Sequence, residues 1–192
     1  IWLLLGSIAV KASGGKAFNR SYLFSPRGDE AAAYDKIHLF DVVLPSGEVR
    51  QESRMIEAGA RAVLAATDFG LVGMTVCYDV RFPYLYRALA HQGARLFTVP
   101  AAFTVSTGQM HWETLLRARA IENGAFVIAP AQCGDHGGGR LTYGHSLIID
   151  PWGRVLAEGG DAPGIIYADL DLAEVDRFRS AIPSLDHERA ID

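Results

Sequence analysis

The sequence lacks the features that mark several large classes of protein. Only two of its 192 residues are cysteines, Cys77 and Cys133, and they form no CxxC pair. This usage fits a reducing compartment better than a disulfide scaffold, so we expect a cytoplasmic protein. The formal net charge of −4 gives no electrostatic reason to bind nucleic acid or an anionic membrane. The apolar run at residues 1–10 is too short to span a bilayer, so we expect no membrane partner.

Signatures of bound nucleotides and metals are missing too. The chain contains no G-x-x-x-x-G-K-S/T loop, no G-x-G-x-x-G turn and no H-E-x-x-H pair. Four of the six histidines, His38, His111, His136 and His145, are candidate metal ligands, but their spacing matches no zinc motif. The segment Tyr143–Ile148 resembles a nucleophile elbow, but Ile148 stands where the G-x-S-x-G motif needs glycine. A serine hydrolase is therefore disfavoured.

The most informative segment that is present runs from Leu71 to Pro83. A β-rich apolar run ends at Cys77, a polar turn follows, and a helical pattern covers residues 82–92. A thiol at the carboxyl end of a strand lies where open α/β folds bind ligands. The positive end of the helix dipole would favour its thiolate form, which attacks carbonyl carbon. The alternative is a buried structural cysteine, since free cysteine is among the most buried residue types.

Alternating strand and helix patterns predict one layered α/β domain over residues 1–192. The run at residues 1–10 predicts a fully buried strand in the middle of a sheet. Because a domain rarely begins with a central strand, we expect this chain to be the C-terminal part of a longer protein. We expect helices at residues 82–92, 110–123 and 172–179, and loops at 40–60 and 134–140. Further strands are expected at residues 17–24, 31–39, 61–67, 69–77, 95–100, 125–133, 145–150, 155–158 and 164–168.

Lys36 and two loop glutamates could assist a nucleophilic cysteine. Lys36 ends a β-pattern, where its ammonium would stabilise an oxyanion, although a strand-end lysine also commonly reaches water. Glu52 and Glu57 are candidate general bases, although loop glutamates are usually solvated. Without further context, the ordinary structural interpretation is favoured for all three residues.

Several strings of residues nevertheless occur together in the order of a known family. They include Tyr34–Asp41 (YDKIHLFD), Gln51–Ser53 (QES), Cys77–Pro83 (CYDVRFP) and Tyr143–Gly153 (YGHSLIIDPWG). On these residues the chain resembles the nitrilase superfamily of carbon–nitrogen hydrolases, most closely its Nit-type amidase branch. The resemblance implies a four-layer αββα sandwich whose N-terminal part is missing here.

The resemblance also implies a Glu-Lys-Cys triad. Cys77 matches its nucleophile, Lys36 its lysine, and Glu52 a second glutamate that helps to position groups near the site. The general-base glutamate of the family precedes the strand with Gly6–Ile8, so no residue of this chain is assigned that role. We therefore expect the 192-residue chain alone to be inactive.

The implied reaction is hydrolysis of a small carboxylate-bearing amide through a cysteine thioester, without metal or cofactor. The substrate class includes ω-amides and deaminated glutathione. Tyr78 and Arg81 are expected to contact the substrate, Arg81 by clamping a carboxylate, although an ion pair with Asp79 is an equal alternative. Relatives imply a homo-oligomer formed through the helices at 82–92 and 110–123. The competing hypotheses are a non-catalytic fragment or pseudoenzyme and, more weakly, a thiol redox protein.

Overall fold

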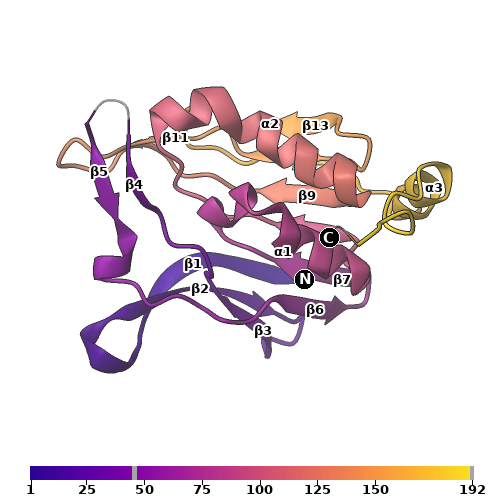
Figure 1. Ribbon diagram of the computed structural model, residues 1–192, viewed down its shortest axis with the longest axis horizontal. Helices are drawn as coiled ribbons and strands as arrows, with labels where there is room; N and C mark the ends of the chain where they lie inside the picture. Colours follow the sequence, from indigo (N-terminus) through magenta and orange to yellow (C-terminus); the bar gives the residue numbers. More distant parts are fainter. Residues whose placement is uncertain (45–46, 191–192) are drawn as a thin grey trace.

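The computed structural model describes residues 1–44 and 47–190, whose strands and helices stack in three layers (Figure 1). The central layer is a six-stranded sheet in the order β13-β12-β9-β8-β7-β6. Helices α1 (Pro83–His91) and α2 (Val105–Asn123) pack on one face of it. A three-stranded antiparallel sheet packs on the other face, formed by β1 (Leu3–Lys11), β2 (Ala17–Phe24) and β3 (Glu30–Asp35). The order α, β, β matches three successive layers of the expected αββα sandwich.

The remaining elements complete the central sheet and its margins. The six strands are β6 (Val63–Thr67), β7 (Gly70–Met74), β8 (Leu96–Thr98), β9 (Phe126–Ala129), β12 (Leu147–Ile149) and β13 (Val155–Glu158). Two hairpins pair β4 (Asp41–Val43) with β5 (Val49–Gln51) and β10 (Cys133–Asp135) with β11 (Leu141–Tyr143). Helix α3 (Ala173–Ala181) lies at the opposite end of the molecule from the β4–β5 hairpin (Figure 1). Short 3-10 helices span Ser13–Gly15, Glu52–Arg54 and Cys77–Arg81.

Strand β7 shows how the sequence divides the core between the layers. Successive side chains of a strand point to opposite faces of the sheet. Val72 and Met74 are buried between the two sheets. Gly73 lies between them, on the helical side, where a Cβ atom would be only 2.7 Å from the Phe97 ring and 3.2 Å from Leu89. A larger side chain at position 73 would therefore collide with the residues that seat α1 on the sheet.

The parallel strands β7, β8 and β9 determine where the candidate site forms. Because they run in the same direction, the segments that follow them meet at one edge of the sheet. The N–H of Cys77, after β7, donates to the carbonyl of Pro100, after β8, at 3.0 Å. Ala101 in turn bridges to Ala131, which follows β9. The chain thus delivers Cys77 to the carboxyl edge of the central sheet.

Most of the predicted elements are present, with shifted ends. Strand β1 pairs with β2, and β6 pairs with β7, both antiparallel. Helix α2 begins at Val105 rather than 110 and ends at Gly124, whose φ of 53° is the left-handed conformation expected of a glycine cap. Helical periodicity in the sequence predicts that Trp112, Leu115, Leu116, Ala120 and Ile121 share one face; Trp112, Leu116 and Ala120 are buried, whereas Leu115 is half-buried and Ile121 is 43% exposed.

The prediction of a central, fully buried first strand was wrong. Strand β1 lies at the edge of the three-stranded sheet, and Leu3, Leu5 and Ile8 are 54%, 38% and 45% exposed. Within residues 1–44 and 47–190, one face of this sheet packs on the central sheet, so residues that point to the other face remain accessible. An apolar run indicates that its side chains prefer to be buried, but it does not indicate which face of the sheet packs against another element.

Two predicted loops and one predicted strand also need correction. The segment 40–60 contains the β4–β5 hairpin as well as a 3-10 turn, and 134–140 lies within the β10–β11 hairpin. Each of these strands has three residues, too few to show a clear alternation of polar and apolar residues. Conversely, residues 164–168 form no strand in the described chain, although their composition is β-like. No helix among residues 1–44 and 47–190 is long and apolar enough to cross a membrane.

Candidate active site

Cys77 is the first residue of a tight turn rather than the last residue of a strand. Strand β7 ends at Met74, and the 3-10 helix Cys77–Arg81 separates it from α1. The φ angle of Cys77 is 51°, a left-handed conformation that residues other than glycine rarely adopt. Such strain persists where surrounding contacts impose it, and it is concentrated at functional sites. Here the hydrogen bond from the Cys77 N–H to Pro100 helps to impose it.

The environment of the Cys77 thiol has opposing effects on its ionisation. Burial raises the pKa of the Cys77 thiol, and the charges of the Lys36 ammonium and a hydrogen bond from the Ala102 backbone oppose that shift. The net direction is upward, opposite to the one expected from the helix dipole. The expectation failed because the thiol is desolvated, and desolvation disfavours its charged form. A protonated thiol needs a base to accept its proton before it can attack a carbonyl carbon.

Lys36 and Glu52 meet beside this thiol. Lys36 is only 3% exposed, so it does not extend to water as the structural alternative proposed. Its Nζ lies 2.5 Å from Oε2 of Glu52, whose side chain is 17% exposed. Oε2 also accepts the N–H of Phe40 at 2.7 Å, and Oε1 accepts from the Asn19 side chain at 3.3 Å. Of the two candidate loop glutamates, the structure thus brings Glu52 to Lys36.

Local backbone structure explains why this lysine turns inward. Strand β3 ends at Asp35, and the N–H of Lys36 donates to the carbonyl of Asn19 on β2 at 2.9 Å. The carbonyl of Lys36 accepts from the N–H of Gly59 at 2.8 Å. A Cβ atom on Gly59 would lie 2.1 Å from the Asp35 carbonyl oxygen, so only glycine permits this approach. The segment after β5 therefore covers the lysine on the side that would otherwise face solvent.

Tyr78 lines a small cavity next to Cys77, and Arg81 lies against two of the aromatic rings that line it. The cavity is lined by Phe40, Cys77, Tyr78, Ala102, Phe103, Thr104 and Thr107. The Arg81 guanidinium lies 5.4 Å from the centre of the Phe103 ring and 5.9 Å from that of Tyr78. Burial lowers the pKa of Arg81, and its Nη2 lies 3.2 Å from Nδ1 of His111. The Asp79 carboxylate, the alternative partner of Arg81, is bonded to other groups.

Asp79 is the residue at this site whose position sequence reasoning missed. Its side chain is fully buried and accepts four hydrogen bonds, from Tyr34, Val76 and both the N–H and Nδ1 of His38. The only feature of the local sequence that points to Asp79 is that it is an acidic residue two positions after the cysteine. The tyrosine that donates to it is 45 residues away in the sequence, so no local pattern identifies the contact.

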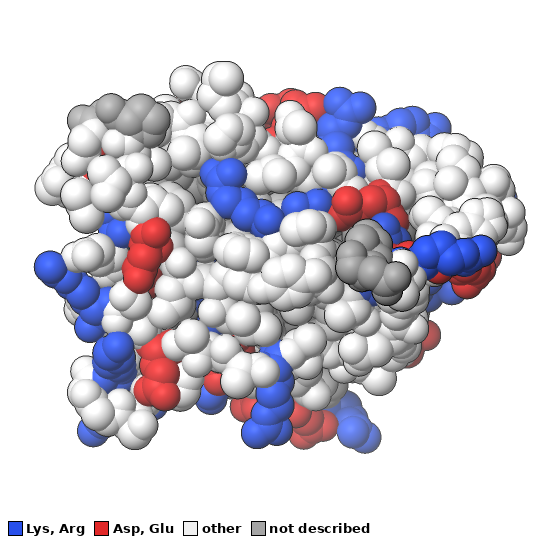
Figure 2. Space-filling view, in the orientation of Figure 1, with Lys and Arg blue, Asp and Glu red and all other residues white. Residues whose placement is uncertain are grey.

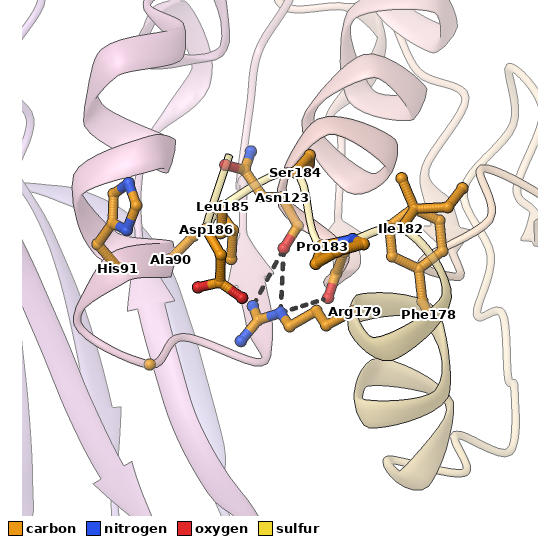
Figure 3. A pocket seen from close by; sticks show the side chains of 12 residues that line it. Ala90, His91, Asn123, Phe178, Arg179, Ile182, Pro183, Ser184, Leu185 and Asp186 are labelled. Carbon is orange, nitrogen blue, oxygen red and sulfur yellow. Dashed lines mark hydrogen bonds between the residues drawn. The ribbon is translucent and has the colours of Figure 1, made fainter. Parts of the chain in front are cut away.

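A second cavity, larger than the one at Cys77, lies elsewhere and has a structural explanation. Figure 3 shows it between the ends of α1 and α2 and the chain after α3, lined among others by Asn123, Arg179 and Leu185. Nε of Arg179 donates to the carbonyls of Gly124 and Asn123 at 3.1 and 3.3 Å (Figure 3). Its Nη2 donates to the carbonyl of Ala94 at 2.6 Å. Arg179 thus fastens α3 to the helical layer, and this cavity shares no lining residue with the one at Cys77.

Comparisons with known proteins agree on the family of this fold. The carbon-nitrogen hydrolase family model matches residues 1–180. A deaminated glutathione amidase of Synechocystis sp. is 47% identical over 191 residues, which cover 97% of this chain and 70% of the relative. The structure of the C. elegans NitFhit protein has a TM-score of 0.93 and 41% identity, and the match covers 98% of this chain and 47% of that one. The chain thus spans about half the length of that protein.

A third similarity bears on the cysteine. A variant of the amidase from Nesterenkonia sp. AN1 is 28% identical, with a TM-score of 0.77 over 95% of this chain and 68% of that one. Its structure shows Michael addition of acrylamide at the active site cysteine. In that relative, therefore, the cysteine of the shared fold reacts as a nucleophile.

Proposed function

This chain belongs to the carbon–nitrogen hydrolase family, and from that premise we propose that it carries the nucleophile of an amidase. The reaction is hydrolysis of the C–N bond of a small carboxylate-bearing amide, with release of ammonia. The observation that carries the proposal is the meeting of Cys77, Lys36 and Glu52 at one edge of the central sheet. Deaminated glutathione is the first substrate to test, because relatives with 41–47% identity over nearly the whole chain are named deaminated glutathione amidases.

The first half of the reaction forms a thioester. The Cys77 sulfur attacks the amide carbonyl carbon while its proton passes to a carboxylate base, and a tetrahedral oxyanion results. The Lys36 ammonium stabilises that oxyanion, together with a backbone N–H that follows Cys77. The N–H of Cys77 itself is already bonded to Pro100, so it does not serve as this donor. Collapse of the intermediate breaks the C–N bond, and the nitrogen leaves as ammonia after it is protonated.

The second half releases the acid. Water attacks the thioester carbonyl and gives a proton to the base, and collapse of the second tetrahedral intermediate breaks the C–S bond. The thiol recovers a proton and the carboxylic acid product leaves. Both halves pass through an oxyanion at the same place, so one ammonium serves both.

We assign Glu52 to the positioning of Lys36 rather than to proton transfer from Cys77. Its Oε2 already accepts from Lys36 and from the Phe40 N–H, which leaves that oxygen poorly available to a thiol proton. The Glu52 carboxylate lies 2.5 Å from the Lys36 ammonium, which is almost fully buried, so it supplies an opposite charge that holds the ammonium in place. The general base is then a further glutamate, as the family pattern implies, and not one that we assign within residues 1–192.

The contacts around the cavity suggest how the substrate is selected. Arg81 is cationic and its guanidinium lies over two rings that line the cavity, so it can pair with a carboxylate on the substrate. Tyr78 and Phe40, which meet edge to face at 4.9 Å, would contact the carbon chain between that carboxylate and the amide. This arrangement favours an acid that carries its amide a few bonds away. We further propose a homo-oligomeric, cytoplasmic protein, as the sequence predicted.

The test is ammonia release by the purified full-length protein from deaminated glutathione, with simple ω-amides of dicarboxylic acids for comparison. We expect release of ammonia together with a transient mass increase on the peptide that contains Cys77, as a thioester requires. A folded full-length protein that forms neither product nor adduct with any of these amides would refute the proposal. That outcome would favour the alternative, a non-catalytic scaffold.

A further inference from the structure

Asp79 joins the two segments that carry the proposed catalytic residues. Its Oδ2 accepts from the Tyr34 hydroxyl at 2.7 Å and from the Val76 N–H at 2.8 Å. Its Oδ1 accepts from the N–H and the Nδ1 of His38 at 3.1 and 2.7 Å. Tyr34 and His38 stand two residues before and two after Lys36, and Val76 immediately precedes Cys77. One carboxylate therefore holds both sides of the site.

The hydrogen bonds to Asp79 form a fully satisfied buried network rather than an incidental surface contact. Asp79 is fully buried, and a buried carboxylate is costly unless hydrogen bonds replace its lost water. Two donors on each oxygen fill the roughly four acceptor positions of a carboxylate. None of the four donors belongs to a lysine or an arginine. The charge is thus compensated by backbone and aromatic groups whose positions become fixed by it.

The link extends through His38 to the helical layer. Nδ1 of His38 is hydrogen-bonded to Asp79, and Nε2 on the other side of the ring is hydrogen-bonded to the Tyr84 hydroxyl on α1. The His38 ring stacks on Phe82 with centroids 3.6 Å apart and planes 8° from parallel. The segment after Lys36 is therefore clamped between the Cys77 turn and the start of α1.

We infer that Asp79 is a positioning residue for the proposed reaction: it fixes the turn of Cys77 against the segment of Lys36, so that thiol and ammonium meet the same carbonyl group. The inference rests on the proposed amidase function. Asp79 does not act as the base, because both of its oxygens already accept two hydrogen bonds. It does not activate the thiol electrostatically either, because its negative charge raises the pKa of Cys77.

The decisive variant is Asp79→Asn in the full-length protein, which keeps the size of the side chain and loses two of its acceptor positions. We expect kcat for amide hydrolysis to fall about 100-fold, as misplacement by about 1 Å can cause, with KM little changed. Hydrogen–deuterium exchange of the backbone at residues 34–38 and 76–82 should become faster. A merely structural residue would lower thermal stability without this split between kcat and KM.

Asp150→Asn provides the matched control. Asp150 is 2% exposed and accepts from the N–H groups of Trp152 and Arg154, both at 2.9 Å, in the turn between β12 and β13. Its loss should lower stability while leaving kcat and exchange at residues 34–38 and 76–82 unchanged. If Asp79→Asn does not fold, Tyr34→Phe removes one donor without changing the packed volume and should give the same changes to a smaller extent.

The outcomes separate the inference from the function on which it rests. A wild-type protein that hydrolyses no amide refutes the function, and the exchange measurement then decides alone whether Asp79 fixes the two segments. A folded Asp79→Asn protein with wild-type kcat overturns the inference. So does a lower kcat without faster exchange, which would assign Asp79 a direct chemical role.

Discussion

Cys77, the proposed nucleophile, is partly buried. Its backbone is held in a left-handed conformation, and the residue lines a small cavity, where the charge of Lys36 affects the pKa of its thiol. Cys133, the other free cysteine, lies in the β10–β11 hairpin and packs against Gly144. A Cβ atom added to Gly144 would be 2.8 Å from the Cβ of Cys133. The two cysteines thus have different surroundings, which makes one a control for the other.

Replacing the nucleophile tests its role directly. We expect Cys77→Ala in the full-length protein to abolish ammonia release, because the acyl-enzyme cannot form, and to leave the circular dichroism spectrum unchanged. Cys133→Ala should retain most of the activity. More than trace ammonia release by the Cys77→Ala protein would contradict the assignment of the nucleophile.

Replacing Lys36 tests where its charge acts. We expect Lys36→Met to lower kcat more than it raises KM, because the ammonium stabilises charge that develops only in the transition state. Loss of one oxyanion donor commonly costs about 100- to 1,000-fold in rate. Lys11→Met, at an exposed position of β1, is the matched control and should be neutral. A normal kcat with a raised KM would instead assign Lys36 to substrate binding.

The pH dependence of thiol alkylation follows from the opposing effects on Cys77. Only thiolate reacts, and burial raises the pKa of the thiol, so alkylation by iodoacetamide should be slow at neutral pH and accelerate as the pH rises. The Lys36 charge lowers this pKa, so in Lys36→Met the midpoint of the pH profile should move to higher pH. Above both midpoints the two rates should converge. A midpoint unchanged by the substitution would show that the two groups do not interact.

Sequence patterns identified single residues better than they identified contacts. Cys77, Lys36 and Glu52 were proposed as site residues because each lies within a distinctive string; in the structure Lys36 and Glu52 lie 2.5 Å apart, and both charges affect the pKa of Cys77. Asp79 lies in the same string as Cys77, yet its donors are contributed by residues 34, 38 and 76. Which of several acidic residues becomes buried depends on segments that meet only in the fold.

At the scale of elements, long periodic segments were predicted and short pairings were missed. Helix α2, with 19 residues, has enough turns for its buried face to be visible in the sequence. The β4–β5 and β10–β11 hairpins have three-residue strands, and tertiary contacts rather than composition define them. The β4–β5 hairpin matters to the site, because Glu52 follows β5 directly and is aimed at Lys36 by it.

Gly73 on β7 offers a test of how tightly the layers pack. We expect Gly73→Ala to destabilise the protein by about 1–3 kcal/mol, because its Cβ would lie 2.7 Å from the Phe97 ring and both β8 and α1 would have to move. Gly164→Ala introduces a Cβ with nothing within 4 Å and should change the stability by less than about 0.5 kcal/mol. Thermal unfolding of the two variants measures the difference. Equal melting temperatures would show that the sheet and helix adjust without cost.

At the scale of the whole molecule, the helical face is the surface where the sequence predicts assembly. Figure 2 shows a face whose middle is mostly neither acidic nor basic, crossed by a short row of charged side chains. Helix α2 exposes Met110 at 73% and Ile121 at 43%, whereas Trp112, Leu116 and Ala120 are buried. Soluble monomeric proteins rarely expose large contiguous apolar patches, and contact between two copies of the chain would cover these side chains.

Substitution of Met110 tests this assembly. We expect the full-length protein to be a homodimer or larger by light scattering, and Met110→Lys to shift it towards the monomer, because a charge would be buried at the contact. Val43→Lys is the matched control, since Val43 is equally exposed at 73% but lies on the β4–β5 hairpin, away from the helices. A monomeric wild-type protein would refute the assembly. Dissociation by Val43→Lys and not by Met110→Lys would place the subunit contact on the β4–β5 hairpin. The helical face would then not be the surface through which the subunits assemble.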